Sequence, residues 1–213
     1  VRNAVQRPTI FSLRELDVTL PCLRQRLRAK HRHDRIERRP QALEPGQTLG
    51  LVGPTGSGKT TLLRVLQRQA TPQHGSVEWG GHALSDYTLA TLRGALSWVP
   101  QESFLFSATI AENIALARPD ASRAMIEHAA RMADIHDDIL RFPQGYETPV
   151  GERGITLSGG QRQRVAIARS LLADSTLLLL DDALSAVDTG TETRILEHLA
   201  ELRRERPERS VVI

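Results

Sequence analysis

The sequence predicts an α/β fold in which a mainly parallel sheet carries a phosphate-binding loop. Three observations lead to this prediction. Residues 53–60, GPTGSGKT, fit the pattern G-x-x-x-x-G-K-[ST] at every fixed position. The flanking stretches 48–52 and 61–67 have the patterns of a short buried strand and of a helix with apolar residues at helical spacing. Farther along the chain, predicted strands and helices alternate, as they do around parallel sheets.

The glycine-rich loop predicts a site for a nucleoside triphosphate. Glycine permits backbone conformations that other residues avoid, so successive N–H groups can face a polyphosphate. The dipole of the following helix adds partial positive charge there. We expect Lys59 to reach the β- and γ-phosphates and the Thr60 hydroxyl to bind Mg²⁺. The predicted nucleotide-binding residues of this loop are Gly53, Pro54, Thr55, Gly56, Ser57, Gly58, Lys59, Thr60 and Thr61.

Composition and length indicate a globular protein with one large domain or a domain with a subdomain. The 213 residues are 40% hydrophobic and 25% charged, which is ordinary for such a protein and ample for a buried core. No apolar run approaches the roughly 18 residues that a membrane helix needs. Cys22 is the only cysteine, so no disulfide can form within the chain, and a reducing compartment fits.

The positive charge of the chain comes from one segment. Residues 24–39 hold eight Lys or Arg against Asp34 and Glu37, a net charge of +6, whereas the whole chain carries +3. The computed pI of 9.6 therefore does not predict a nucleic-acid-binding protein. For residues 21–40 three interpretations stand: a basic surface arm, a disordered insertion, or a stretch read in a shifted coding frame. We favour the last two, because charge runs are usually only solvated.

The remaining elements follow from periodicity and turn residues. A connector over residues 1–20 runs into a strand at 15–20. A stripe of small and apolar residues predicts a helix over 121–133, and the four leucines at 177–180 indicate a strand buried on both faces. The other expected elements are strands at 76–79, 96–99, 175–180 and 210–213, and helices within 107–142 and over 161–172 and 189–205.

Three further features accompany the loop. Residues 157–161, LSGGQ, open a helix with a serine hydroxyl and bare N–H groups, which makes a second anion site. Because the loop already holds its own phosphates, this second site predicts a nucleotide from another subunit, bound by Ser158, Gly159, Gly160 and Gln161. The leucine-rich strand delivers Asp181 to the Mg²⁺ opposite Thr60, and Gln101 follows another strand, from which it can reach the metal or the attacking water.

Together these features resemble the nucleotide-binding domain of ABC transporters over roughly residues 41–213. The matching motifs are Walker A at 53–60, the Q-loop at Gln101, the signature at 157–161, Walker B ending at Asp181, and the D-loop at 185–188. Residues 104–114 and 150–154 look like the exporter segments that meet the coupling helices of the membrane domain. The likeness is strongest to bacterial multidrug half-exporters of the MdlA type.

The resemblance implies a P-loop ATPase core with a mainly parallel sheet, an antiparallel β region and a helical subdomain. Its parts would be a connector and basic segment (1–40), the first part of the core (41–101), a helical and signature subdomain (102–160) and a C-terminally truncated second part (161–213). It implies ATP and Mg²⁺ as cofactors, and ATP hydrolysis coupled to transport at the cytoplasmic face of the bacterial inner membrane. The expected partners are a second ATPase subunit and a transmembrane domain, without nucleic acid. In that family six transmembrane helices precede this domain, so we expect the chain to be part of a longer protein.

The sequence departs from the family pattern at three places. The window that normally holds an adenine-stacking aromatic falls in the aromatic-free basic segment, and the family's switch histidine would lie beyond Ile213. Asp182 stands where exporters usually have the glutamate that serves as general base. Gln101 and Asp182 are therefore the predicted catalytic residues. An aspartate there often marks the slow site of a heterodimeric exporter, which predicts a heterodimer.

Two other functions compete with this reading. A non-transport ABC-type ATPase acting on nucleic acid or ribosomes would use the basic segment for phosphate contacts. The exporter-like segments at 104–114 and 150–154 argue against it. A small-molecule P-loop kinase would leave LSGGQ without a role.

Overall fold

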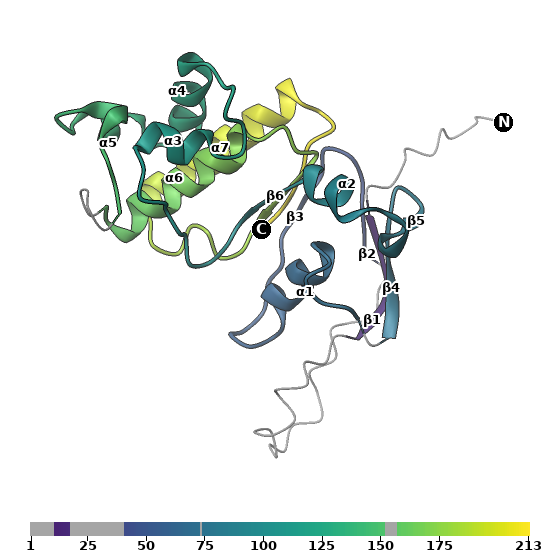
Figure 1. Ribbon diagram of the computed structural model, residues 1–213. Helices are drawn as coiled ribbons and strands as arrows, with labels where there is room; N and C mark the ends of the chain where they lie inside the picture. The colour runs from purple at the N-terminus through teal and green to yellow at the C-terminus, as the bar shows by residue number, and fades with distance from the viewer. Residues whose placement is uncertain (1–10, 18–40, 73, 152–156) are drawn as a thin grey trace.

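The structure is a computed structural model that describes residues 11–17, 41–72, 74–151 and 157–213. A parallel four-stranded sheet carries a layer of helices, and an antiparallel four-stranded sheet stands at one side of the molecule (Figure 1). This is the fold class that the sequence predicts. Within the described residues, no helix is both long and apolar enough to cross a bilayer.

The parallel sheet positions the phosphate-binding loop. Its strand order is β3 (Thr48–Leu49), β8 (Ser210–Val212), β7 (Leu177–Leu180) and β6 (Leu96–Val99). All neighbouring pairs run parallel. The last strand in the sequence thus lies next to the strand that leads into the loop, and the Leu51 N–H donates to the Ile213 carbonyl at 2.6 Å.

The antiparallel sheet stands beside this core. Its order is β2 (Gln41–Leu43), β1 (Phe11–Asp17), β4 (His74–Trp79) and β5 (His82–Ala83). Gly80 and Gly81 join β4 to β5 with φ of 55° and 82°, a left-handed turn that favours glycine. The predicted hairpin after residue 79 is therefore present.

Helices cover both faces of the parallel sheet (Figure 1). Leu178 and Leu180 of β7 pack into a large core with the helical layer, whereas Leu177 and Leu179 pack into a second core with the helix that follows the loop. The burial of β7 on both faces is as predicted. The helices are α1 (Lys59–Leu66), α2 (Leu89–Gly94), α3 (Ile110–Ala115), α4 (Arg123–Met132), α5 (His136–Leu140), α6 (Gly159–Leu172) and α7 (Thr189–Glu205), with short 3₁₀ turns at Leu84–Asp86 and Gly145–Glu147.

Several predicted bounds were wrong. The first strand covers 11–17 rather than 15–20, whose last three residues lie outside the described ones. The strand expected at 48–52 ends at Leu49, because the chain bends into the loop, and the strand expected at 175–180 begins at Leu177. The helix expected at 161–172 begins at Gly159, since Ser158 caps it. Helix α2 was not predicted, although the Thr88 hydroxyl caps it by accepting from the Thr91 N–H.

Candidate nucleotide-binding site

The loop between β3 and α1 has the backbone that a phosphate cradle needs. Gly56 and Gly58 have φ of 83° and 94°, values that strain any residue with a Cβ. A Cβ on Gly53 would also lie 2.7 Å from the Ser57 hydroxyl. Gly58 caps α1 without a side-chain acceptor, so no capping side chain occupies the first N–H groups of the helix, which point toward the loop.

Lys59 lies at the mouth of this loop. Its ammonium donates to the Gly53 carbonyl at 2.6 Å and to the Pro54 carbonyl at 3.2 Å. A compact ammonium beside the backbone N–H groups of the loop gives a bound phosphate a full positive charge close by. The structure therefore places the Lys59 ammonium against the loop, and its contact with the β- and γ-phosphates stays a prediction.

Two residues far apart in the sequence meet at the base of the loop. The Thr60 hydroxyl donates to Oδ1 of Asp181 at 2.9 Å, and Asp181 is buried. The Asp181 N–H donates to the Val99 carbonyl at 2.9 Å, which fixes the end of β7 beside β6. A hydroxyl and a carboxylate together fit Mg²⁺, which takes few protein ligands and completes its shell with phosphate oxygens and water.

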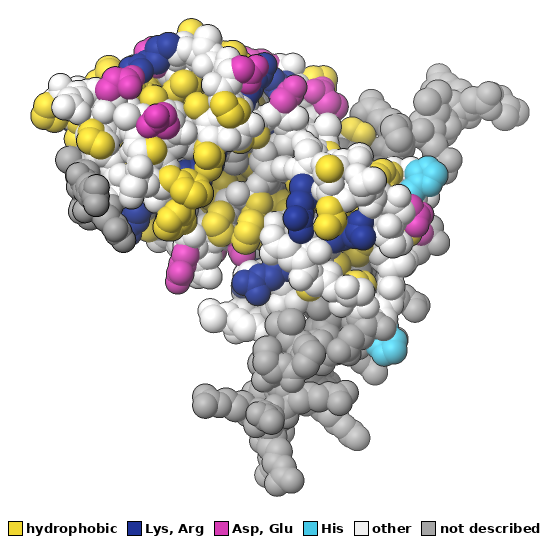
Figure 2. Space-filling model, in the orientation of Figure 1, with side chains coloured by type: hydrophobic (Ala, Val, Ile, Leu, Met, Phe, Trp, Pro, Cys, Tyr) yellow, Lys and Arg dark blue, Asp and Glu magenta, His cyan; other side chains and the backbone are white. Residues whose placement is uncertain are grey.

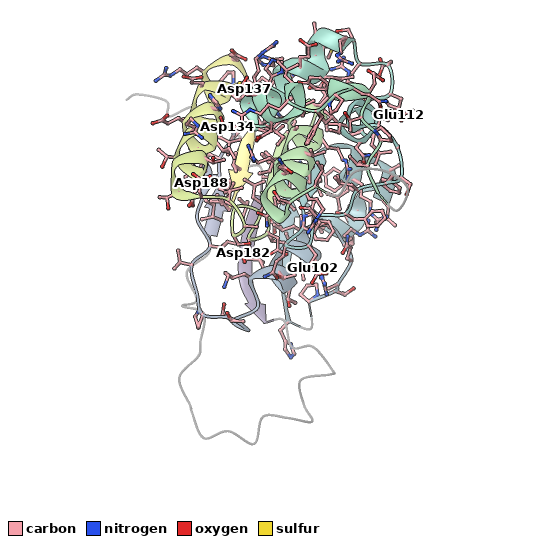
Figure 3. The ribbon with its side chains drawn as sticks, turned by 90° about the vertical axis from the view of Figure 1, so that its left-hand side faces the viewer. Glu102, Glu112, Asp134, Asp137, Asp182 and Asp188 are labelled. Atoms are coloured by element: carbon pink, nitrogen blue, oxygen red, sulfur yellow. The ribbon has the colours of Figure 1, made fainter. Side chains whose placement is uncertain are left out.

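A second polar pair lies at the same end of the sheet. The Gln101 side-chain amide donates to Oδ2 of Asp182 at 3.2 Å. Asp182 and Glu102, which follow the paired strands β7 and β6, lie past the same end of the sheet (Figure 3). Asp182 is exposed and has φ of 52°, a left-handed value that aspartate tolerates better than most residues. Its carboxylate is thus available to solvent but already has a hydrogen-bond partner.

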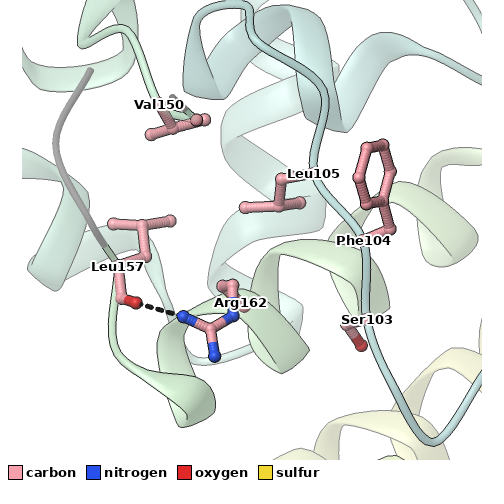
Figure 4. A pocket seen from close by; sticks show the side chains of 7 residues that line it. Ser103, Phe104, Leu105, Val150, Leu157 and Arg162 are labelled. Carbon is pink, nitrogen blue, oxygen red and sulfur yellow. Dashed lines mark hydrogen bonds between the residues drawn. The ribbon is translucent and has the colours of Figure 1, made fainter. Parts of the chain in front are cut away.

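The signature residues open α6 as a capped helix. The Ser158 hydroxyl accepts from the Gln161 N–H at 3.2 Å, and the Gln161 side chain accepts from the Ser158 N–H at 3.0 Å. Gly159 and Gly160 form the first turn. Arg162 donates to the Leu157 carbonyl at 2.6 Å and so steadies the approach to the helix (Figure 4).

The D-loop is fastened to the signature helix by a residue that the sequence analysis missed. The buried Gln163 side chain donates to the Ser185 hydroxyl at 3.2 Å and accepts from the Ala186 N–H at 2.9 Å. Ser185 in turn donates to the Asp182 carbonyl at 2.9 Å. A polar residue among the buried positions of an amphipathic helix is the signal that could have revealed Gln163.

An apolar hollow lies next to the signature. Its volume is about 350 Å³, and Ser103, Phe104, Leu105, Val150, Gly151, Leu157 and Arg162 line it (Figure 4). Phe104 and Phe106 are exposed, and their rings meet edge to face at 5.1 Å. Hydrophobic side chains gather along this side of the helical layer (Figure 2). Residues 152–154 of the second exporter-like segment, and the window of the expected adenine contact, lie outside the described residues.

Comparisons with known proteins agree with this site. The family model described as ABC transporter matches residues 40–185. The multidrug resistance-like ATP-binding protein MdlA of Escherichia coli is 53% identical over 167 residues, which are 78% of this chain and 28% of that protein. Human ATP-binding cassette sub-family B member 6 is 49% identical over 158 residues, 74% of this chain and 19% of that protein.

A solved structure has the same fold. A bacterial Atm1-family ABC exporter with ATP bound superposes with a TM-score of 0.80 and 40% identity, over 98% of this chain and 34% of that one. The chain thus spans about a third or less of the length of these relatives. Its phosphate loop, signature helix and Walker B strand, together with these likenesses, show that the chain belongs to the ABC transporter family and carries an exporter-type ATP-binding domain.

Proposed function

We propose that this chain binds Mg-ATP in a head-to-tail dimer and powers export across a membrane. The observation that carries the proposal is the hydrogen bond between Thr60 and Asp181, which joins the loop to Walker B at a site suited to Mg²⁺. Lys59 and the loop N–H groups would hold the phosphates. Ser158, Gly159, Gly160 and Gln161 would bind the γ-phosphate of the partner's nucleotide.

The chain would be the slow half of a heterodimer. A general base must come within about 2.6–3.2 Å of the water it activates. Asp182 is one methylene shorter than glutamate, and Gln101 already holds its carboxylate at 3.2 Å. Its own site would therefore retain ATP through Lys59, Thr60 and Asp181 without fast turnover. The complete, well-capped signature would serve the faster site of the partner.

The membrane partner would dock beside the signature. The exposed Phe104 and Phe106 and the adjacent hollow offer an apolar surface of the kind that receives a coupling helix. By analogy with the MdlA proteins, the assembly would be a multidrug exporter whose ATPase domains face the cytoplasm at the bacterial inner membrane. The substrate would be chosen by the membrane helices.

Two variants test the proposal in a reconstituted full-length pair. Ser158→Arg should stop most ATP hydrolysis, because the bulky cation blocks the partner's site. Asp182→Asn should change hydrolysis little, since this chain's own site contributes little turnover. If Asp182→Asn removes most of the activity and Ser158→Arg spares it, Asp182 is a working base and the asymmetric model fails. If both variants keep the parent's activity, the signature does not take part in the catalytic site.

A further inference from the structure

Arg169, on α6, is a half-buried cation whose hydrogen-bond partners are all neutral oxygens. Its Nε donates to the Asn113 carbonyl at 2.7 Å, its Nη2 to Asn113 Oδ1 at 3.0 Å, and its Nη1 to the Phe104 carbonyl at 3.2 Å. No ion pair joins it to any carboxylate of the described residues. A cation withdrawn from water without a counter-charge is costly, so an apolar side chain would serve better if packing were its only purpose.

Asn113, on α3, completes the contact from the other side. It is almost fully buried at 1% exposure. Its Oδ1 accepts from the Phe106 N–H at 2.9 Å, and its Nδ2 donates to the Phe106 and Thr109 carbonyls, both at 3.0 Å. Arg169 also lies over the Phe106 ring, 5.9 Å from its centroid. The two residues therefore hold the backbone and one ring of residues 104–106.

Helix α6 links this clamp to the signature. The helix begins at Gly159, and Arg169 lies on it about 15 Å farther along at roughly 1.5 Å per residue. A continuous helix of this length is stiff, so its two ends move together. Residues 104–106 are thus bound to the same helix whose N-terminus carries Ser158.

We infer that Arg169 is a positioning residue that fastens residues 104–106 to the signature helix, through Asn113, so that force on this aromatic surface reaches Ser158. This rests on the proposed function, in which the aromatic surface receives the membrane domain. Asn113 shares the role because it supplies both acceptors that Arg169 uses on α3. The clamp acts on the timing of site closure and leaves nucleotide binding at the loop unchanged.

Hydrogen exchange of the 213-residue chain tests the clamp itself. Arg169→Met should speed exchange of the Phe106 N–H by about tenfold or more. Arg169→Lys should do so less, because an ammonium keeps part of the contact, although it cannot bridge all three oxygens as the guanidinium fork does. Arg164→Met is the matched control. Arg164 lies on the same helix but pairs with Asp138 at 2.7 Å and donates to the Asp134 carbonyl. Unchanged exchange at Phe106 in Arg169→Met, or equal acceleration in Arg164→Met, would overturn the clamp.

Kinetics of the exporter reconstituted in lipid vesicles test the positioning role. Arg169→Met should lower kcat for ATP hydrolysis by about tenfold while the KM for ATP stays within about twofold, and Arg164→Met should keep both values. A rise in KM with unchanged kcat, or unchanged values for both, contradicts the inference. If the parent exporter hydrolyses no ATP, the proposed function fails, and the exchange experiment still decides whether the clamp exists.

Discussion

At the scale of single residues, Lys59 differs from Arg64, the next cation along α1. Its ammonium reaches two loop carbonyls, whereas Arg64, one turn farther along α1, is exposed on the outer side of that helix. Lys59 is also one of two lysines in a chain whose other basic residues, apart from histidine, are arginine. A compact, strongly hydrated ammonium acts on a phosphate as a point charge and needs no planar pair of acceptors, as a guanidinium fork does.

We therefore expect Lys59→Ala to abolish Mg-ATP binding, measured by titration calorimetry. Within the part of the chain that the structure describes, no neighbouring basic side chain replaces the phosphate contact, and each charge-assisted hydrogen bond contributes about 1.5–3 kcal/mol. Arg64→Ala is the control, with an expected affinity equal to that of the parent. An affinity of Lys59→Ala within a few-fold of the parent's would contradict the assignment of the loop.

At the scale of elements, the first turn of α6 is packed against the D-loop. A Cβ on Gly160 would lie 2.7 Å from the Ala186 carbonyl oxygen, whereas a Cβ on Gly159 would meet the Ala186 methyl at an ordinary 3.6 Å. The two glycines are neighbours in one helix, yet only one of them is needed for close approach. The signature and the D-loop thus form one packed unit, which Gln163 secures by hydrogen bonds.

Gly160→Ala should destabilise the chain by about 1–3 kcal/mol, because the D-loop must move away from the helix. Gly159→Ala is the matched control, since alanine brings the same gain in helix propensity at a site with room for it. The free energies of unfolding would be measured by urea denaturation. Equal stability of the two variants would mean that the D-loop moves away from the helix without a loss in the free energy of unfolding.

Helix α3 begins with a reciprocal cap that includes an ionisable side chain. Oε2 of Glu112 accepts from the Thr109 N–H at 2.8 Å and from the Thr109 hydroxyl at 2.9 Å. The backbone hydrogen bond, and then the hydroxyl, lower the pKa of Glu112 below its ordinary 4.5. A group whose pKa is lower in the folded state stabilises the fold above its unfolded pKa and loses this effect as the pH falls through the folded value.

Glu112→Gln should therefore be less stable than the parent at pH 7, and the difference should shrink as the pH falls below 4.5. Glutamine keeps the cap geometry and removes only the charge, so the comparison isolates the ionised carboxylate. Urea denaturation at a series of pH values from neutral to acidic measures it. A difference that stays constant across this range would assign the effect to shape instead of charge.

At the scale of the whole molecule, local sequence patterns predicted the helices and strands, whereas long-range contacts decided how these elements are joined. The strand at 96–99 and the helix at 189–205 follow from periodicity, and the structure gives them the predicted bounds. The contact between Thr60 and Asp181 was expected because the sequence predicts both as ligands of one Mg²⁺. The clamp between Arg169 and Asn113 was missed, since its acceptors are mainly backbone oxygens that leave no mark in sequence.

Long-range contacts also decide the place of β8, which lies between β3 and β7 and contributes to both cores. Val211 belongs to the core of the helical layer, and the adjacent Val212 belongs to the core that contains Leu63 and Leu66 of α1. Alternation along a strand sends the two side chains to opposite faces of the sheet. The last described strand therefore supports the helix layer with one residue and the phosphate loop's helix with the next.

Because the two valines belong to different cores, we expect both to contribute to the stability of the fold but only Val212 to affect nucleotide affinity. Val211→Ala and Val212→Ala each remove two buried methyl groups and should each cost about 1–3 kcal/mol in the free energy of unfolding. Only Val212→Ala loosens the packing beneath α1, so it should weaken Mg-ATP binding by about threefold or more while Val211→Ala leaves binding near the parent's. Urea denaturation and calorimetric titration of both variants provide the two measurements. Equal loss of affinity in the two variants would show that the sheet transmits the defect as a whole, and the separation of the two cores would then have no bearing on the loop.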